Sequence, residues 1–287
     1  MRALLRSLKD LYTYRDLLRN LVLREVRVRY KGSVLGFLWS FVTPLTMFLV
    51  YYLVFSMLTK RFDMSAADYA LFLLSGLLAW MFFQSSVAKA TPSIRANGML
   101  VRMVYFPRAV LPISTVLGEL VFFLSALAVL FVVSILINHR FPVGIVALPV
   151  VLPAHLLLAL GFGLIFATLS VFYRDTEQVV NLLLSIGIFA SPVFYATDKV
   201  AKKAPALAGM LGHILGPRAG ATAADALVHL YFWNPVIYVL QCYRAMFQEG
   251  ALPSRGDVLI SYAAGLAVFA IGFGIFIRYQ GHFAEEL

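Results

Sequence analysis

The sequence has little charge and almost no cysteine, and each shortage excludes a class of protein. Only 13% of the 287 residues are charged, against about 25% in soluble globular domains. A single cysteine excludes an internal disulfide framework. The hydrophobic content of 61% excludes a disordered or collagen-like chain, and so much apolar sequence cannot be hidden in one soluble core of this size. The composition therefore predicts a polytopic α-helical membrane protein.

The motifs of nucleotide and metal chemistry are also missing. There is no G-x-x-x-x-G-K-[ST] loop to cradle nucleotide phosphates, so an energised transporter would need ATP and Mg²⁺ to be bound by a partner chain. There is no His-Glu-x-x-His and no Cys/His cluster at metal-ligand spacing. We expect no cofactor and no metal in this chain, and we expect no enzymatic activity. A membrane-embedded glycan-processing enzyme is an alternative, for which the sequence offers only the close carboxylates Asp175 and Glu177.

Six apolar segments are long enough to cross a bilayer, which takes about 20 residues. They are 34–58, 69–88, 109–137, 144–172, 179–197 and 258–279. Pro44 and Pro192 are expected to kink the first and the fifth. A further apolar stretch, 227–247, contains polar residues and a proline, and we interpret it as one or two re-entrant or interfacial helices.

The distribution of Lys and Arg predicts the orientation, because these residues accumulate on the cytoplasmic side. They gather in 1–33 and 89–108 and recur at Arg174 and Arg278, whereas few occur in the short opposite loops. Both termini are therefore expected in the cytoplasm, with 198–257 outside. Basic segments facing anionic lipid also account for the net charge of +10 without a nucleic-acid partner.

Two segments on the expected cytoplasmic side are amphipathic. In residues 15–31, a polar face lies opposite a leucine-rich face, which is typical of a helix on a membrane surface. This helix is either a simple anchor or a docking helix. Loop 89–108 has cations and no acid, yet it keeps an apolar run. An apolar face exposed there indicates a docking site for another protein, with a lipid-facing turn as the alternative.

Aromatic residues repeat along one face of the first span. Helical periodicity places five of them within an arc of about 60°, with a sixth beside it. These are Phe37, Phe41, Phe48, Tyr52 and Phe55, with Tyr51 beside them, and Phe194, Tyr195 and Trp233 could extend the face outward. Such rings can stack on sugars without gripping one hydroxyl, which suits a sliding polymer. Helix packing or lipid contact is the alternative.

Glu119 is an acid within the third span. A charge at membrane depth points to a function by default. Arg244 is one cation with which it could pair, and a purely structural ion pair is the alternative.

Four segments of the chain carry a family resemblance. They are LREVRVRYKGSVLGFLWSFVTPL (Leu23–Leu45), NGMLVRMVYFPRAVLP (Asn97–Pro112), FYRDTEQVVNLLLSIGIFASPVFY (Phe172–Tyr195) and WNPVIYVLQCYRAMF (Trp233–Phe247). Together they resemble the membrane subunits of ABC transporters that export O-antigen, teichoic acid and capsule. The Tyr-Lys-Gly-Ser and Val-Tyr-Phe-Pro-Arg runs are closer to the O-antigen and teichoic-acid branch.

The resemblance implies a homodimer in a bacterial cytoplasmic (inner) membrane that works with two copies of a separate ATPase and moves a lipid-linked polysaccharide. Spans one and five would line the path. The interface helix would include Arg24, Arg27, Arg29, Tyr30 and Lys31. The ATPase contacts would include Arg95, Asn97, Met99, Leu100, Arg102, Tyr105, Phe106, Arg174 and Asp175. The insert 198–232 is longer than the family leads us to expect. A drug or lipid exporter with the same fold, or an adaptor without transport, is an alternative.

The expected organisation is an all-α membrane protein with six transmembrane helices. Residues 1–33 form the amphipathic interface helix, and 34–197 form spans one to five with the coupling loop 89–108. Residues 198–257 form an outer loop with re-entrant helices. Residues 258–287 form the last span and a short cytoplasmic tail.

Overall fold

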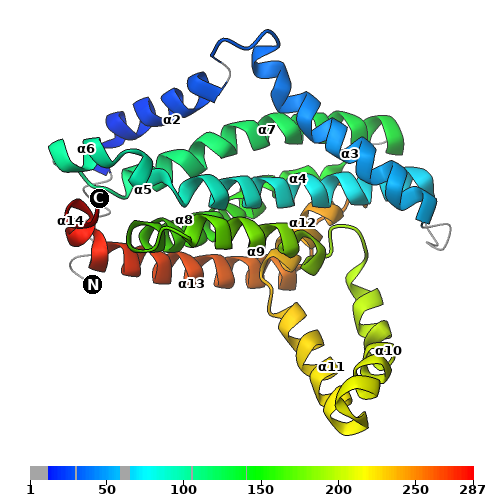
Figure 1. Cartoon of the computed structure of the whole chain (residues 1–287). Coiled ribbons are helices and arrows are strands. Elements are labelled where there is room, and N and C mark those ends of the chain that lie inside the picture. Colours follow the sequence, from blue (N-terminus) through cyan, green and yellow to red (C-terminus); the bar gives the residue numbers. More distant parts are fainter. Residues whose placement is uncertain (1–11, 30, 59–64, 105, 140) are drawn as a thin grey trace.

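The computed structural model describes residues 12–29, 31–58, 65–104, 106–139 and 141–287, which form helices and connecting turns with no strand among them (Figure 1). The helices are α2 (Arg15–Arg29), η1 (Gly36–Leu38), α3 (Trp39–Leu58), α4 (Ala66–Ala90), α5 (Ser93–Ala96), α6 (Gly98–Met103), α7 (Val110–Asn138), η2 (Val143–Ala147), α8 (Leu148–Phe172), α9 (Thr176–Ala190), α10 (Thr197–Leu215), α11 (Pro217–Phe232), α12 (Val236–Phe247), α13 (Arg255–Tyr279), η3 (Gln280–His282) and α14 (Phe283–Glu286). The all-helical class expected from composition is confirmed.

Five helical segments in the described part of the chain are long and apolar enough to cross a membrane. They are Gly36–Val54, Ala66–Ala90, Val110–Asn138, Val143–Phe172 and Arg255–Glu286. They coincide with five of the six expected spans. Helices α4, α7, α8 and α13 run side by side along one axis, as in a membrane bundle, and α3 crosses them at an angle (Figure 1).

The fifth expected span, 179–197, is wrong at its outer end. Helix α9 has 15 residues and ends at Ala190. It is therefore about 22 Å long, short of the hydrocarbon core of about 30 Å. Pro192 has no backbone N–H and disfavours helical geometry in the residue before it. Pro192 thus ends α9 where a kink was expected, whereas Pro44 lies inside the continuous helix α3.

Helix α4 is the centre of the bundle. It packs against α7, α8 and α12 and is mostly buried. Helices α8 and α13 approach each other closely through glycines: a Cβ added at Gly161 would lie 2.6 Å from the Phe269 nitrogen. Small residues at such positions let the backbones of membrane helices pack directly.

The stretch 227–247 is broken, as expected, into the end of α11 and the whole of α12. Helix α12 is buried against α4, α8 and α13. The long insert forms the hairpin α10–α11, which turns at Gly216 and projects from the bundle (Figure 1). Gly216 has a φ of +89°, a conformation that favours glycine.

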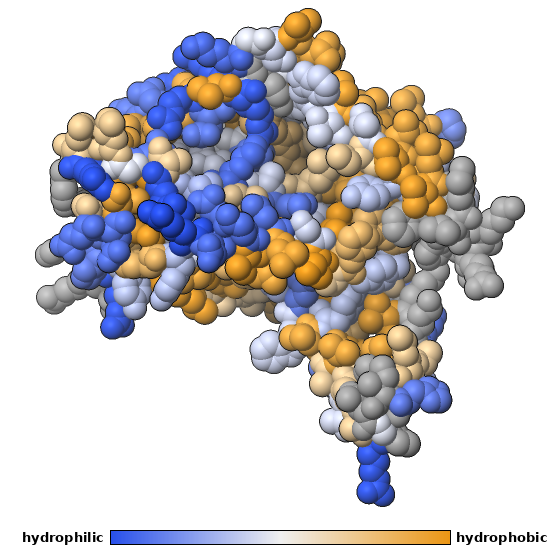
Figure 2. Space-filling model, in the orientation of Figure 1, coloured by the Kyte–Doolittle hydropathy of each residue, from blue (hydrophilic) through white to orange (hydrophobic). Residues whose placement is uncertain are grey.

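Hydrophilic and apolar surfaces are segregated along the bundle. Figure 2 shows hydrophilic side chains gathered over the end that carries α2 and α6, and apolar side chains towards the opposite end. Helix α3 exposes several large apolar residues, namely Leu45, Met47, Leu49, Val50, Leu53 and Val54. These surfaces have the polarity of a chain that meets water at one end and lipid or another apolar surface along its length.

Candidate functional site

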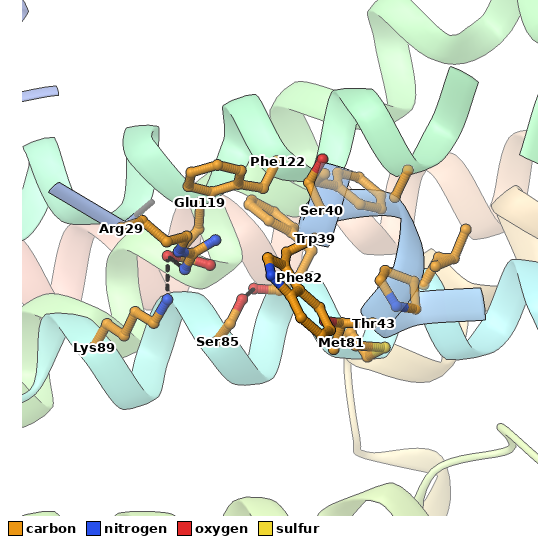
Figure 3. Close-up of a pocket in the computed structure, with 14 residues that line it drawn as sticks. Arg29, Trp39, Ser40, Thr43, Met81, Phe82, Ser85, Lys89, Glu119 and Phe122 are labelled. Atoms are coloured by element: carbon orange, nitrogen blue, oxygen red, sulfur yellow. Dashed lines mark hydrogen bonds and ion pairs between the residues drawn. The ribbon is translucent and has the colours of Figure 1, made fainter. Parts of the chain in front are cut away.

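A buried ion cluster joins three helices at the hydrophilic end of the bundle. Glu119 of α7 is 7% exposed. Its Oε1 accepts a hydrogen bond from Arg29 at the end of α2 and another from Lys89 Nζ of α4 at 2.7 Å (Figure 3). The Arg29 guanidinium also lies 3.8 Å from the centroid of the Phe122 ring. One carboxylate therefore ties together the ends of two helices that are far apart in the sequence.

Local sequence explains why these side chains meet. Helix α2 packs against α7 through its leucine-rich face, where Leu21 is buried. Gly118 permits the close approach, because a Cβ there would lie 3.1 Å from Glu25 Cβ. Arg29 and Lys89 each occupy the last turn of a helix, where the helix dipole favours a cation. The expected amphipathic helix is thus present, with its apolar face on the bundle.

Glu119 does not pair with Arg244, the one cation that the sequence analysis left open as its partner. Arg244 of α12 donates hydrogen bonds to the carbonyl oxygens of Pro192 and Val193 and lies 3.6 Å from the Phe72 ring centroid. A Cβ added at Gly76 would lie 2.9 Å from Arg244 Nη2, and Gly76 is about 20 Å along α4 from Lys89 at 1.5 Å per residue. The two buried charges therefore lie at different depths of the bundle.

A cavity of about 350 Å³ lies beside Glu119, between the end of α2, the start of α3, α4 and α7 (Figure 3). This volume falls in the usual range of about 300–1,000 Å³ for small-molecule sites. Its lining combines charges, hydroxyls and aromatic rings, and it includes Arg29, Lys89, Glu119, Ser40, Thr43, Ser85, Trp39, Phe82 and Phe122. This chemistry suits a polar ligand with a flat apolar face.

The predicted coupling loop forms the two short helices α5 and α6, which are divided at Asn97. On α6, Met99 and Met103 are 73% and 75% exposed, and Arg102 is exposed beside them. Leu100 is partly buried against the core. Phe106 differs from expectation, because it is buried and anchors the segment. The predicted contact Tyr105 lies outside the described residues.

Polar contacts connect this loop to its neighbours. Arg24 Nη2 donates to Asn97 Oδ1 at 3.1 Å, which joins α2 to the break before α6. Arg95 forms an ion pair with Glu177 of α9, with 3.2 Å between Nη1 and Oε1. The loop is therefore held to α2 through Asn97 and to α9 through Arg95.

The remaining predicted residues at this end are placed as follows. Arg174 and Asp175 are exposed in the turn before α9. Arg27 and Lys31 are exposed, whereas Arg29 points inward to Glu119. Tyr30 lies outside the described residues. The structure thus separates the interface-helix set into surface cations and one buried partner of Glu119.

Most of the predicted aromatic face forms two ring clusters. Phe37 contacts Phe41 and Phe122 near the cavity, with ring centroids 5.6 and 6.1 Å apart. Towards the other end, Tyr51 meets Phe194 at 5.0 Å, and Tyr52 lies between Phe48 and Tyr69.

Two predicted aromatic residues stand apart from these clusters, and a third is not described. Tyr195 meets Tyr231 of α11, with ring centroids 6.4 Å apart. Trp233 is 84% exposed and is not brought to the clusters. Phe55 lies in α3, but its side chain is outside the described residues.

Sequence reasoning missed Lys89 as a partner of Glu119, and it missed Tyr69 and Phe72 of α4, whose rings lie 6.1 Å apart. The aromatic signal at Tyr69 and Phe72 was readable as two rings one turn apart at the start of the second span. Within the described residues, no group of three or more His, Cys, Asp or Glu could hold a metal ion.

Known proteins are similar to this chain over most of its length. The model of the ABC-2 type transporter family matches residues 16–208. The chain is 30% identical over 284 residues to the O-antigen export system permease protein RfbA of Myxococcus xanthus, covering 99% of this chain and 100% of that protein. It is 28% identical over 273 residues to the protein of the same name from Klebsiella pneumoniae, covering 95% of each. It is 23% identical over 260 residues to the polysialic acid transport protein KpsM of Escherichia coli, covering 89% of each. The chain belongs to the ABC-2 type transporter family.

Proposed function

We propose that this chain is the membrane subunit of an ATP-driven exporter that moves a lipid-linked polysaccharide, of the O-antigen or teichoic-acid type, across a bacterial cytoplasmic membrane. The relatives named for O-antigen export, polysialic acid transport and capsule polysaccharide export all handle glycan polymers, which supports a glycan cargo. The observation that carries the proposal is the aromatic face of α3, which offers rings along the length of a span. Both termini lie in the cytoplasm, together with the hydrophilic end of the bundle.

The chain acts as a homodimer in this proposal. Helix α3 is barely buried in its own chain, and α9 exposes Val179, Leu182, Leu183 and Ile186. Two copies that face each other through α3 and α9 would cover these surfaces and enclose a path lined by the aromatic clusters. The exposed apolar area supports such a contact, because large exposed apolar patches mark protein or membrane interfaces.

Two copies of a separate ATPase bind ATP and Mg²⁺ and dock on α6. When the ATPase closes, it pushes α5–α6, whose motion reaches α2 through Arg24 and Asn97 and through the shared acceptor Glu119. Helix α2 leads into α3 through a link with glycines at both ends. Gly32 and Gly36 have φ values of +79° and +50°, and nothing lies within 4 Å of either Cβ position. This link can change conformation more readily than a packed helix.

The test is purification of the chain together with its ATPase, followed by reconstitution in proteoliposomes loaded with the native glycolipid. We expect a stoichiometric ATPase to co-purify and glycan to cross the bilayer with ATP. An ATPase partner without glycan movement would point to a drug or lipid cargo. A folded, monodisperse chain that retains neither partner nor glycan would contradict the exporter and leave the enzyme and adaptor alternatives. The control is an ATPase with its Walker A lysine replaced by alanine.

A further inference from the structure

The last residues of the chain pack beneath the predicted ATPase contacts. The tail segment is defined as residues 280–287 and comprises η3 and α14. Its Phe283 is fully buried, with ring centroids 5.2 Å from Phe276 and 6.2 Å from Phe172. Phe172 is the last residue of α8, directly before the exposed turn that contains Arg174. The tail segment is thus packed against the residue that precedes the turn with Arg174, one of the predicted ATPase contacts.

The tail segment also contacts the start of α6 and the chain shortly after α6 ends. A Cβ at Gly98, the first residue of α6, would lie 3.8 Å from Leu287 Cβ. Arg108, a few residues after α6, donates a hydrogen bond to the Gln280 carbonyl oxygen. Figure 1 shows α14 beside α6 at the same end of the bundle. The other predicted contact is therefore held at its start and just beyond its end.

We propose that the tail segment is a positioning element for ATPase docking, with Phe283 as its anchor. This inference rests on the proposed function, because it takes α6 as the docking helix. Helix α6 has six residues, too few to keep a helix in water on its own. It turns Met99 and Met103 outward and buries Val101. The tail segment supports α6 from the bundle side. It also fixes the position of α6 relative to the turn at 173–175, so that one partner can bind both.

The first test measures the affinity of the ATPase for the full-length permease in nanodiscs. In Phe283→Ala the anchor is lost and α6 leaves its docking orientation for most of the time. If the population of the docking orientation falls to about one tenth, the apparent Kd rises about tenfold. Phe283→Leu keeps an apolar anchor and should stay within about threefold of the wild type. The matched control is Glu285→Gln on the same helix, which is exposed and should leave the Kd unchanged.

The second test restores the orientation without Phe283. The Cβ separation of 3.8 Å between positions 98 and 287 suits a disulfide, whose Cβ atoms lie about 3.5–4.5 Å apart. The native Cys242 is buried. The pair Gly98→Cys and Leu287→Cys is added to Phe283→Ala. When this pair is oxidised, the Kd should return to the wild-type value, and when it is reduced the Kd should rise again. A purely structural role for Phe283 would not produce this redox-dependent rescue.

The outcomes separate the two proposals. A folded Phe283→Ala variant whose Kd stays within twofold of the wild type overturns the positioning role. If that variant does not fold, Leu287→Ala takes its place, since this half-buried side chain lies at the edge of the bundle; an unchanged Kd there overturns the proposal equally. A wild-type chain that binds no ATPase refutes the proposed function itself, and the role of the tail segment with it.

Discussion

Two buried charges lie at different depths of the bundle, and the protein compensates them in different ways. Glu119 meets the side chains of Arg29 and Lys89, which come from two other helices. Arg244 meets the backbone oxygens of Pro192 and Val193 and the face of an aromatic ring. The first cluster is made between side chains, and the second is made with the backbone of a turn.

This difference separates a connection that can change from one that is fixed. The partners of Glu119 are 23% and 46% exposed in their side chains, so water can replace either bond. The carbonyls held by Arg244 belong to the turn that follows α9. Arg244 binds them from a buried position, so its hydrogen bonds fix one conformation of this turn. We infer that the Glu119 cluster is suited to transmit motion, whereas Arg244 holds the turn after α9 in place.

Removal of Arg244 should have the largest effect. In Arg244→Ala the two carbonyls lose their charged donor, and hydrogen bonds to charged groups contribute about 1.5–3 kcal/mol each. We expect a loss of about 3 kcal/mol in stability, measured as thermal unfolding in detergent by fluorescence-detected size exclusion. Arg244→Lys keeps the charge but not the planar fork, and should lose roughly half as much. An alanine variant as stable as the wild type would show that the turn at 191–195 is held by other contacts.

Removal of the Glu119 charge should act on coupling more than on stability. Glu119→Gln keeps the shape but leaves Arg29 and Lys89 without an anion. Coupling changes of up to about 2 kcal/mol are known for residues between sites, so we expect export per ATP to fall about tenfold. Asp16→Asn is the control, since Asp16 is exposed on the first turn of α2. Unchanged export per ATP in a folded Glu119→Gln variant would remove this cluster from the coupling route.

The two charges also show how far sequence reasoning reaches. Hydropathy predicted the long helices and the break in 227–247, because these depend on local composition. Glu119 could be identified as unusual for the same reason. Its partners could not, since they depend on which helices pack together and on how far each is shifted along its axis. Lys89 lies on a neighbouring span at the same depth, and no periodicity in α7 carries that information.

The aromatic face shows the same limit. The arc along α3 was readable from spacing in one helix, and the structure brings Tyr51 to Phe194. The rings of Tyr69 and Phe72 that complete the cluster lie on α4 and were missed. Trp233 could extend the face outward as judged from the sequence, but its exposed side chain is not part of a cluster.

The smallest effect is expected at Trp233 and sharpens the contrast between a ring in the cluster and a ring outside it. Trp233 is 84% exposed, whereas Tyr51 is partly buried with its ring 5.0 Å from Phe194. An aromatic contact contributes about 1 kcal/mol, so Tyr51→Ala should slow glycan export about fivefold in proteoliposomes. Trp233→Ala should leave the rate within about twofold, because an exposed side chain loses little on truncation. If the two variants slow export equally, the cargo touches Trp233 after it leaves the cluster, and the aromatic path extends to the start of α12.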